Sequence, residues 1–153
     1  MLTLLETALE RADGDYLSPD DLQSLEQAIA TWPQRRQTYD LLQTHEAEIV
    51  AQAIARLSQN APNRYTDDGG DRCQTDMTLV LRACANAMLL QDEELLKDRF
   101  LYWMQNIMQA LRKQQINARV YQALQQAVQE QLPKDKVPFI LPYLQTAKNW
   151  LST

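Results

Sequence analysis

The sequence predicts an all-α protein that folds as a single domain of 153 residues. The chain is rich in Leu, Ala, Gln and Glu, which favour helix, and only three glycines interrupt it, at Gly14, Gly69 and Gly70. Apolar residues recur at helical spacing, and no segment shows the alternation that is typical of a strand. A hydrophobic content of 45% supports one core in a chain of this length.

The first two predicted helices form an N-terminal hairpin over about residues 1–31. An amphipathic helix covers residues 3–12 and ends at Asp13-Gly14. Ser18 is a typical N-cap, and Pro19 suits the first position of the helix that follows. This second helix has an apolar stripe, which consists of Leu22, Leu25, Ala28 and Ile29.

Five longer helices are predicted after the hairpin, which gives seven or eight helices in one domain. Trp32-Pro33 marks the boundary, and a long helix follows to about Ser58. The next segment, Asn60–Gly70, is predicted to be a loop because it is rich in turn-forming residues. Hydrophobic periodicity then predicts helices over residues 72–90, 93–113, 117–132 and 136–151. Four of the five long helices have these apolar stripes: Val50, Ala53, Ile54 and Leu57; Met77, Val80, Leu81, Cys84 and Met88; Val120, Leu124, Ala127 and Val128; and Ile140, Tyr143, Leu144, Ala147 and Leu151.

Three further expectations concern particular side chains of these helices. The methionines and the tryptophan of residues 93–113 are expected to lie in the core. Arg35-Arg36 is expected to be a solvated basic pair, and Pro142 is expected to kink the last helix.

Composition argues against several classes of partner. The chain is mildly acidic, with 15 Lys+Arg and 20 Asp+Glu, so neither nucleic acid nor an anionic membrane is expected as its main partner. No apolar run approaches the ~20 residues that span a bilayer, and no secretory signal is recognised at the N-terminus. Cys73 and Cys84 lie too far apart along one helix for a disulfide between them. We therefore expect a cytoplasmic protein with free thiols.

The sequence shows no arrangement of residues that is typical of an enzyme. The one histidine, His45, precedes the helix that would carry the proximal ligand of a haem globin. It also lacks the second histidine of a zinc-protease motif, and no glycine-rich phosphate loop or nucleophile elbow is present. We expect no haem, no metal and no catalytic residue.

One candidate site lies at the start of the helix predicted over residues 72–90. Cys73 and Asp76 are three residues apart and therefore share one face of that helix. A thiol can form a thioether, and a carboxylate can hold a cation beside it. Taken alone, a helical cysteine is more often a small core residue, and Asp76 could simply favour the helix N-terminus.

Several motifs, in order and spacing, resemble the α and β subunits of the phycobiliproteins. These are globin-like antenna proteins that carry linear tetrapyrroles, or bilins. The resemblance covers essentially the whole chain, and it implies a globin-like fold preceded by a helical hairpin, a cyanobacterial source, and a homodimer or a heterodimer with a related globin. It also implies that any association with thylakoids is through partners. The motifs are Arg11–Ser18, Glu48–Leu57, Gly69-Gly70, Cys73-x-x-Asp76, Leu81-Arg82, Asp98-Arg99 and Leu141-Pro142-Tyr143.

The resemblance also implies roles for particular residues. It places a thioether to the bilin at Cys73, Asp76 beneath the pyrrole nitrogens, and Arg72 close to the pigment. Asp13 and Arg82 match a pair that crosses the dimer interface in the family, although a solvated surface pair is an equal alternative.

The chain departs from the family pattern around the pigment. Thr75 stands where the family has an arginine that binds a bilin propionate, and Gln91 replaces a glycine. The segment between Gly70 and Cys73 is shorter than in the family, and it leaves only Arg72 and Arg64 as nearby basic residues.

These departures favour an accessory role over an antenna role. We expect a non-enzymatic, bilin-associated globin related to phycobilisome subunits, which acts in bilin binding, bilin biosynthesis or antenna assembly. One alternative is a light-harvesting subunit with a bilin attached covalently to Cys73. The other is a bilin-free interaction or sensory globin that has kept only the fold and the dimer surface.

Overall fold

The structure, a computed structural model, describes residues 1–60 and 69–153, without the side chains of residues 60 and 69–71. Within these residues all regular secondary structure is helical, which confirms the all-α prediction. Most of the predicted loop, including Arg64, lies outside the described residues. The elements are α1 (Leu2–Ala12), α2 (Pro19–Ala30), α3 (Trp32–Asn60), α4 (Gly69–Leu90), α5 (Glu93–Leu96), the π-helical turn η1 (Lys97–Leu101), α6 (Tyr102–Ala110), α7 (Gln114–Gln131) and α8 (Val137–Leu151).

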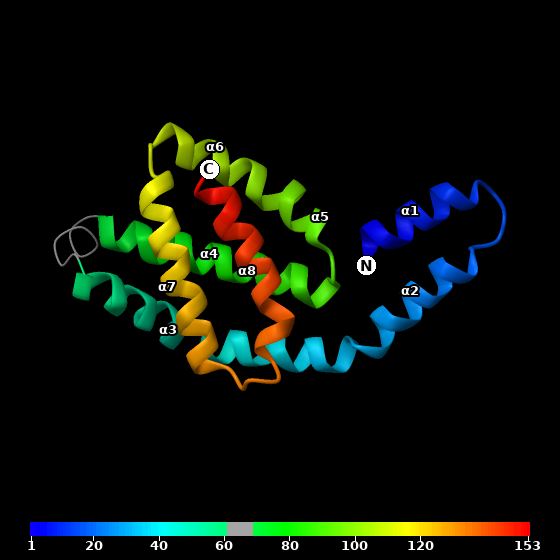
Figure 1. The fold of residues 1–153 in the computed structure, drawn as a ribbon, viewed down its shortest axis with the longest axis horizontal. Helices are drawn as coiled ribbons and strands as arrows, with labels where there is room; N and C mark the ends of the chain where they lie inside the picture. Colours follow the sequence, from blue (N-terminus) through cyan, green and yellow to red (C-terminus); the bar gives the residue numbers. More distant parts are fainter. Residues whose placement is uncertain (61–68) are drawn as a thin grey trace.

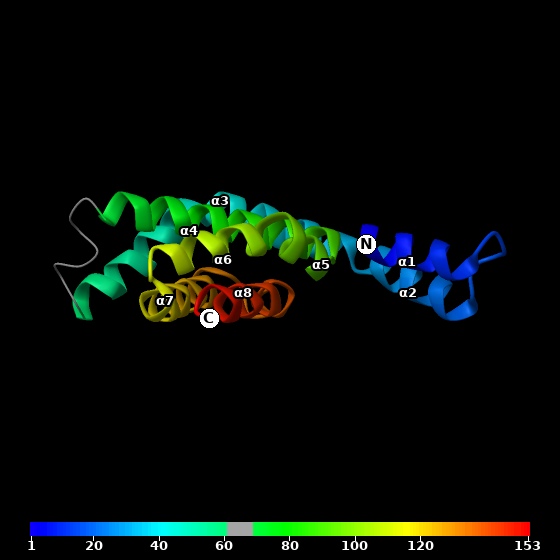
Figure 2. The same cartoon turned by 90° about the horizontal axis from the view of Figure 1, so that it is seen from above.

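The helices form a packed body from which the α1–α2 hairpin projects (Figure 1). In the body, α3 packs against α4 and α7, and α8 packs against α4 and α7. Seen from above, α7 and α8 lie in one layer on one side of α3 and α4 (Figure 2). The α6–α7 corner lies at one end of the body, and the hairpin extends beyond the other end. The hairpin is therefore a projection from the body rather than part of its core.

The core lies where α3, α4, α7 and α8 meet, and the predicted apolar stripes of these helices build it. Val50, Ala53 and Leu57 of α3 are buried, and Ile54 is half-buried against them. The predicted stripes of the other three helices are buried too, apart from the half-buried Tyr143: Met77, Val80, Leu81, Cys84 and Met88 of α4; Val120, Leu124, Ala127 and Val128 of α7; and Ile140, Leu144, Ala147 and Leu151 of α8.

The segment predicted as one helix over residues 93–113 contains a π-helical turn. Asp92 caps the short helix α5 by accepting a hydrogen bond from the Leu95 N–H at 3.0 Å, and η1 then leads into α6. Met104 and Met108 are buried as predicted, but Trp103 is 56% exposed, so its expected place in the core was wrong. Leu101, Met104 and Met108 supply the inward face, and Trp103 follows Leu101 by two residues, far from that face.

Arg35 is buried, with 3% of its surface exposed, so the expectation of a solvated basic pair was wrong for this residue. Its guanidinium donates hydrogen bonds to the carbonyls of Ala28 and Leu89, and its Nε donates to the Thr31 hydroxyl at 3.2 Å. The end of α2 and the end of α4 present these acceptors, so Arg35 joins the hairpin to the body. Arg36 is exposed and pairs with Asp40.

A second polar contact joins α1 to the body. The buried Asp92 accepts hydrogen bonds from the Thr3 N–H at 2.9 Å and from the Thr3 hydroxyl at 2.8 Å. Burial raises the pKa of Asp92, but its hydrogen bonds from Thr3 and Leu95 outweigh burial and lower the pKa overall. Asp92 thus holds the start of α1 against the α4–α5 corner as a charged group.

Candidate functional site

A cleft of about 360 Å³ lies between the start of α4 and the end of α6. One wall is formed by Arg72, Thr75 and Asp76, all on α4. The other wall comes from α6 and the turn that follows it, and it consists of Ile107, Met108, Leu111 and Lys113. Two of the predicted pigment residues, Arg72 and Asp76, therefore line one cavity.

The carboxyl group of Asp76 is half-buried at this cleft. Burial raises its pKa, and the positive charges of Lys113 and then Arg72 lower the pKa by a smaller amount. A carboxylate in such surroundings stabilises a cation that enters the cleft, because little water screens the interaction.

Cys73 interacts with Asp76, as the shared helix face predicts, but its thiol packs against the core beside the cleft. Burial raises the pKa of Cys73 to about 11, with a further contribution from the negative charge of Asp76, while Lys113 acts in the opposite direction. The thiol is therefore protonated at neutral pH, and a protonated thiol is a poor nucleophile.

Tyr121 on α7 belongs to the same cluster, and the sequence analysis did not single it out. It is 2% exposed, and burial raises the pKa of its hydroxyl, followed by the negative charges of Asp76 and Cys73. Its spacing could have predicted its burial, because Tyr121 lies three residues before Leu124 and seven before Val128, on the predicted inner face of α7.

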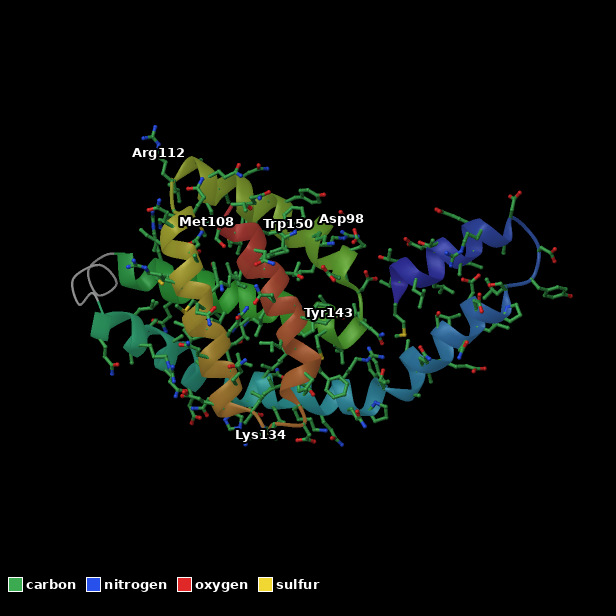
Figure 3. The ribbon with its side chains drawn as sticks, in the orientation of Figure 1. Asp98, Met108, Arg112, Lys134, Tyr143 and Trp150 are labelled. Atoms are coloured by element: carbon green, nitrogen blue, oxygen red, sulfur yellow. The ribbon has the colours of Figure 1, made fainter. Side chains whose placement is uncertain are left out.

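Lys113 is the second functional candidate that the sequence analysis missed. The turn after α6 fixes its backbone, since the Lys113 N–H donates to the Met108 carbonyl at 3.0 Å and the Arg112 N–H donates to Gln109 at 3.1 Å. This is a Schellman turn with Arg112 in the left-handed conformation, at φ 52°. Figure 3 shows the Arg112 side chain directed away from the helices, whereas Lys113 lines the cleft.

Neither of the two predicted interface residues lines this cleft. Arg82 is on another face of α4, where it forms a two-point ion pair with Glu46 of α3, at 2.7 and 2.6 Å. Asp13 ends α1 in the left-handed conformation, at φ 47°, in the turn of the hairpin. No contact between Asp13 and Arg82 is found within the described part of the chain, and their pairing between two chains stays a prediction.

The fold defines a helical domain that carries an N-terminal hairpin and a cleft between α4 and α6. A family model described as "Phycobilisome protein" matches residues 8–151. The chain therefore belongs to this family, within the phycobiliprotein superfamily, and the all-α globin-like fold inferred from the resemblance is confirmed.

Individual relatives are phycocyanin β subunits. The chain is 26% identical over 110 residues to the C-phycocyanin subunit beta of Picosynechococcus sp., a match that covers 66% of this chain and 64% of that protein. It is 28% identical over 120 residues to the C-phycocyanin beta chain of Porphyra purpurea, covering 72% of this chain and 70% of the relative. Among the described residues, none of the helices has both the length and the apolar character needed to cross a membrane.

Proposed function

We propose that this chain is a non-enzymatic, bilin-associated accessory protein, and that its bilin lies in the cleft between α4 and α6. The observation that carries the proposal is the half-buried Asp76 carboxylate in a cleft with an apolar wall. Arg72 at the same cleft is available to a propionate of the pigment. The bilin itself would supply absorption of visible light.

The residues at the cleft fit such a ligand. A tetrapyrrole protonated at its pyrrole nitrogens is a cation, and the Asp76 carboxylate would favour that form through charge-assisted hydrogen bonds. The side chains of Ile107, Met108 and Leu111 would cover the apolar faces of the rings. These residues would hold the pigment extended and exclude water from one side of it.

The state of Cys73 favours a reversible carrier over a covalent antenna subunit. Its thiol packs against the core, and its pKa of about 11 leaves little thiolate for attack at neutral pH. The covalent antenna subunit remains the second candidate, because Cys73 and Asp76 keep the family spacing and the relatives are named as phycocyanin subunits. In that function a lyase would attach the bilin to Cys73.

The test is co-expression of the full chain with a bilin-producing pathway, followed by purification and denaturation in acidic urea. We expect a coloured native protein that loses its pigment on denaturation, and a Cys73→Ala variant that stays coloured. Asp76→Asn should shift and weaken the red absorption band. Cys84→Ala is the matched control, because this second cysteine is fully buried.

Two other results would change the proposal. A denaturation-resistant band with zinc-enhanced fluorescence, absent from Cys73→Ala, would establish the covalent antenna function. A folded chain without any pigment would contradict both functions and leave a bilin-free interaction protein.

We also propose that the chain pairs with a second globin of its family through the hairpin, in the cytoplasm. An apolar row on α1 supports this pairing, since Leu2, Leu5 and Leu9 are 53%, 39% and 56% exposed. On α2, Leu22 and Ile29 of the predicted stripe are also exposed, at 48% and 66%. The chain itself does not bury these side chains, so they form an apolar surface that a partner would cover.

A further inference from the structure

Lys113 lies on the wall of the cleft opposite Arg72, with Asp76 also in the lining. Its side chain is half-buried, whereas that of Arg72 is exposed. Its backbone is held at both sides, because its N–H closes the turn after α6 and its carbonyl accepts the Asn117 N–H of α7 at 2.9 Å. The position of the Lys113 backbone at the cleft is therefore fixed, and its half-buried side chain brings a cationic group to this wall.

The charges in the cleft leave one positive charge without a balancing carboxylate. Its lining holds two cationic side chains, those of Arg72 and Lys113, and one carboxylate, that of Asp76. A bilin with two propionates and a protonated pyrrole system carries one net negative charge, which would balance this positive charge. If Asp76 pairs with the pyrrole nitrogens, each cation is left for one propionate.

We propose that Lys113 binds a propionate of the bilin, from the wall facing α4, and so makes the cleft selective for tetrapyrroles with free carboxylates. This inference rests on the proposed bilin-binding function. Thr75 of α4 carries no charge for such a pair, and Lys113 supplies one from a different element of the fold. An ion pair at a half-buried lysine is less screened by water than one at the exposed Arg72.

Biliverdin and its dimethyl ester provide the test, because they differ only in the propionate charges. Both are titrated into the full-length chain and into Lys113→Met, Lys113→Arg and Arg112→Met, with folding checked by circular dichroism. The unaltered chain should bind the free acid more than about tenfold more tightly than the ester, as expected when Arg72 and Lys113 each contribute one charge-assisted hydrogen bond. Lys113→Met should reduce this preference about tenfold, to the part that Arg72 supplies, with little change in ester binding, and Lys113→Arg should keep it in full.

Arg112→Met is the matched control, since it removes one positive charge from the neighbouring residue outside the cleft lining. It should keep the preference for the free acid. Equal binding of acid and ester to the unaltered chain, or an undiminished preference in Lys113→Met, would overturn the role of Lys113 while leaving bilin binding intact. Failure of both pigments to bind would instead contradict the proposed function itself.

Discussion

Cys73 and Cys84 are two thiols of one helix in very different surroundings. Cys84 is fully buried, and its thiol lies 3.6 Å from the Tyr143 carbonyl as a donor. Cys73 is half-buried, and burial together with the charge of Asp76 raises its pKa to about 11. Since only the thiolate reacts, this difference in burial and protonation sets the chemistry that each cysteine can perform.

The rate of alkylation of each cysteine measures this difference in reactivity directly. In the folded chain, iodoacetamide should modify Cys73 well before Cys84, and the rate should rise about tenfold per pH unit below the pKa of the thiol. Asp76→Asn removes a charge that raises the pKa of Cys73, so the variant should react faster at a given pH. Mass spectrometry locates the label, with Cys84→Ala as control; slower reaction of Asp76→Asn would contradict the assigned electrostatics.

A second residue-scale prediction concerns Gln91, which ends α4 in the left-handed conformation at φ 50°. The Gln91 and Asp92 N–H groups close a Schellman turn onto Met88 and Ala87, at 3.0 and 2.9 Å. A side chain in this conformation costs about 1 kcal/mol, which glycine avoids. Gln91→Gly should therefore raise the free energy of unfolding by about 0.5–1 kcal/mol in urea, whereas Gln91→Ala should leave it nearly unchanged.

At the scale of elements, hydrophobic periodicity predicted the helices well but not their interruptions. The stripes of α4, α7 and α8 are buried because each has an unbroken 3.6-residue period. The π-helical turn η1 adds a residue to one turn without a change in composition, so a regular helical period could not indicate that Trp103 would face outward. Lys113 was missed for a related reason. It reaches the cleft because of the turn after α6, which hydrophobic periodicity does not predict.

Contacts between helices could not be predicted from the sequence either, and Arg35 is the clearest example. Its side chain crosses from α3 to the carbonyls of Ala28 and Leu89, and its guanidinium lies 5.6 Å from the centre of the Trp32 ring. The residues next to Arg35 in the sequence, including the exposed Arg36, show no pattern that would predict a buried arginine. Only the approach of the α2 and α4 ends in three dimensions creates it.

Arg35→Met should consequently destabilise the chain by about 2–4 kcal/mol, because it leaves buried carbonyls without their donors. Arg36→Met, next to it, removes only an exposed pair with Asp40 and should cost less than about 0.5 kcal/mol. Urea denaturation followed by circular dichroism compares the two variants. Equal effects would show that Arg35 contributes no more than a surface arginine.

At the scale of the whole molecule, charge and apolar surface are divided unequally between the hairpin and the body. Residues 1–31 hold seven acidic residues and one arginine, a net charge of −6 in a chain whose total is −5. The same segment extends away from the body (Figure 2) and exposes five large apolar side chains, those of Leu2, Leu5, Leu9, Leu22 and Ile29. Periodicity predicted these residues correctly as helical, but it could not show that the chain itself leaves them uncovered.

A groove of about 250 Å³ between α3 and α4 is the surface that we expect to receive the partner's hairpin. Arg82 and Glu46 lie in its lining, joined by their ion pair. If the partner's hairpin turn binds here as predicted, Glu46 would compete with it for the same guanidinium. Since the Arg82 side chain is 61% exposed, it remains accessible to a carboxylate such as Asp13 of a second chain.

A double-mutant cycle on the association of the chain tests this pairing. Asp13→Asn should weaken the dimer about three- to tenfold in sedimentation equilibrium, as expected for one partly screened ion pair. The same change should have little further effect in an Arg82→Gln background, because its partner charge is then already absent. Glu46→Gln should act oppositely and tighten the dimer by releasing Arg82. Additive effects of Asp13→Asn and Arg82→Gln would show that the two residues do not meet, and a chain that stays monomeric would make a related globin, not a second copy, the partner to test.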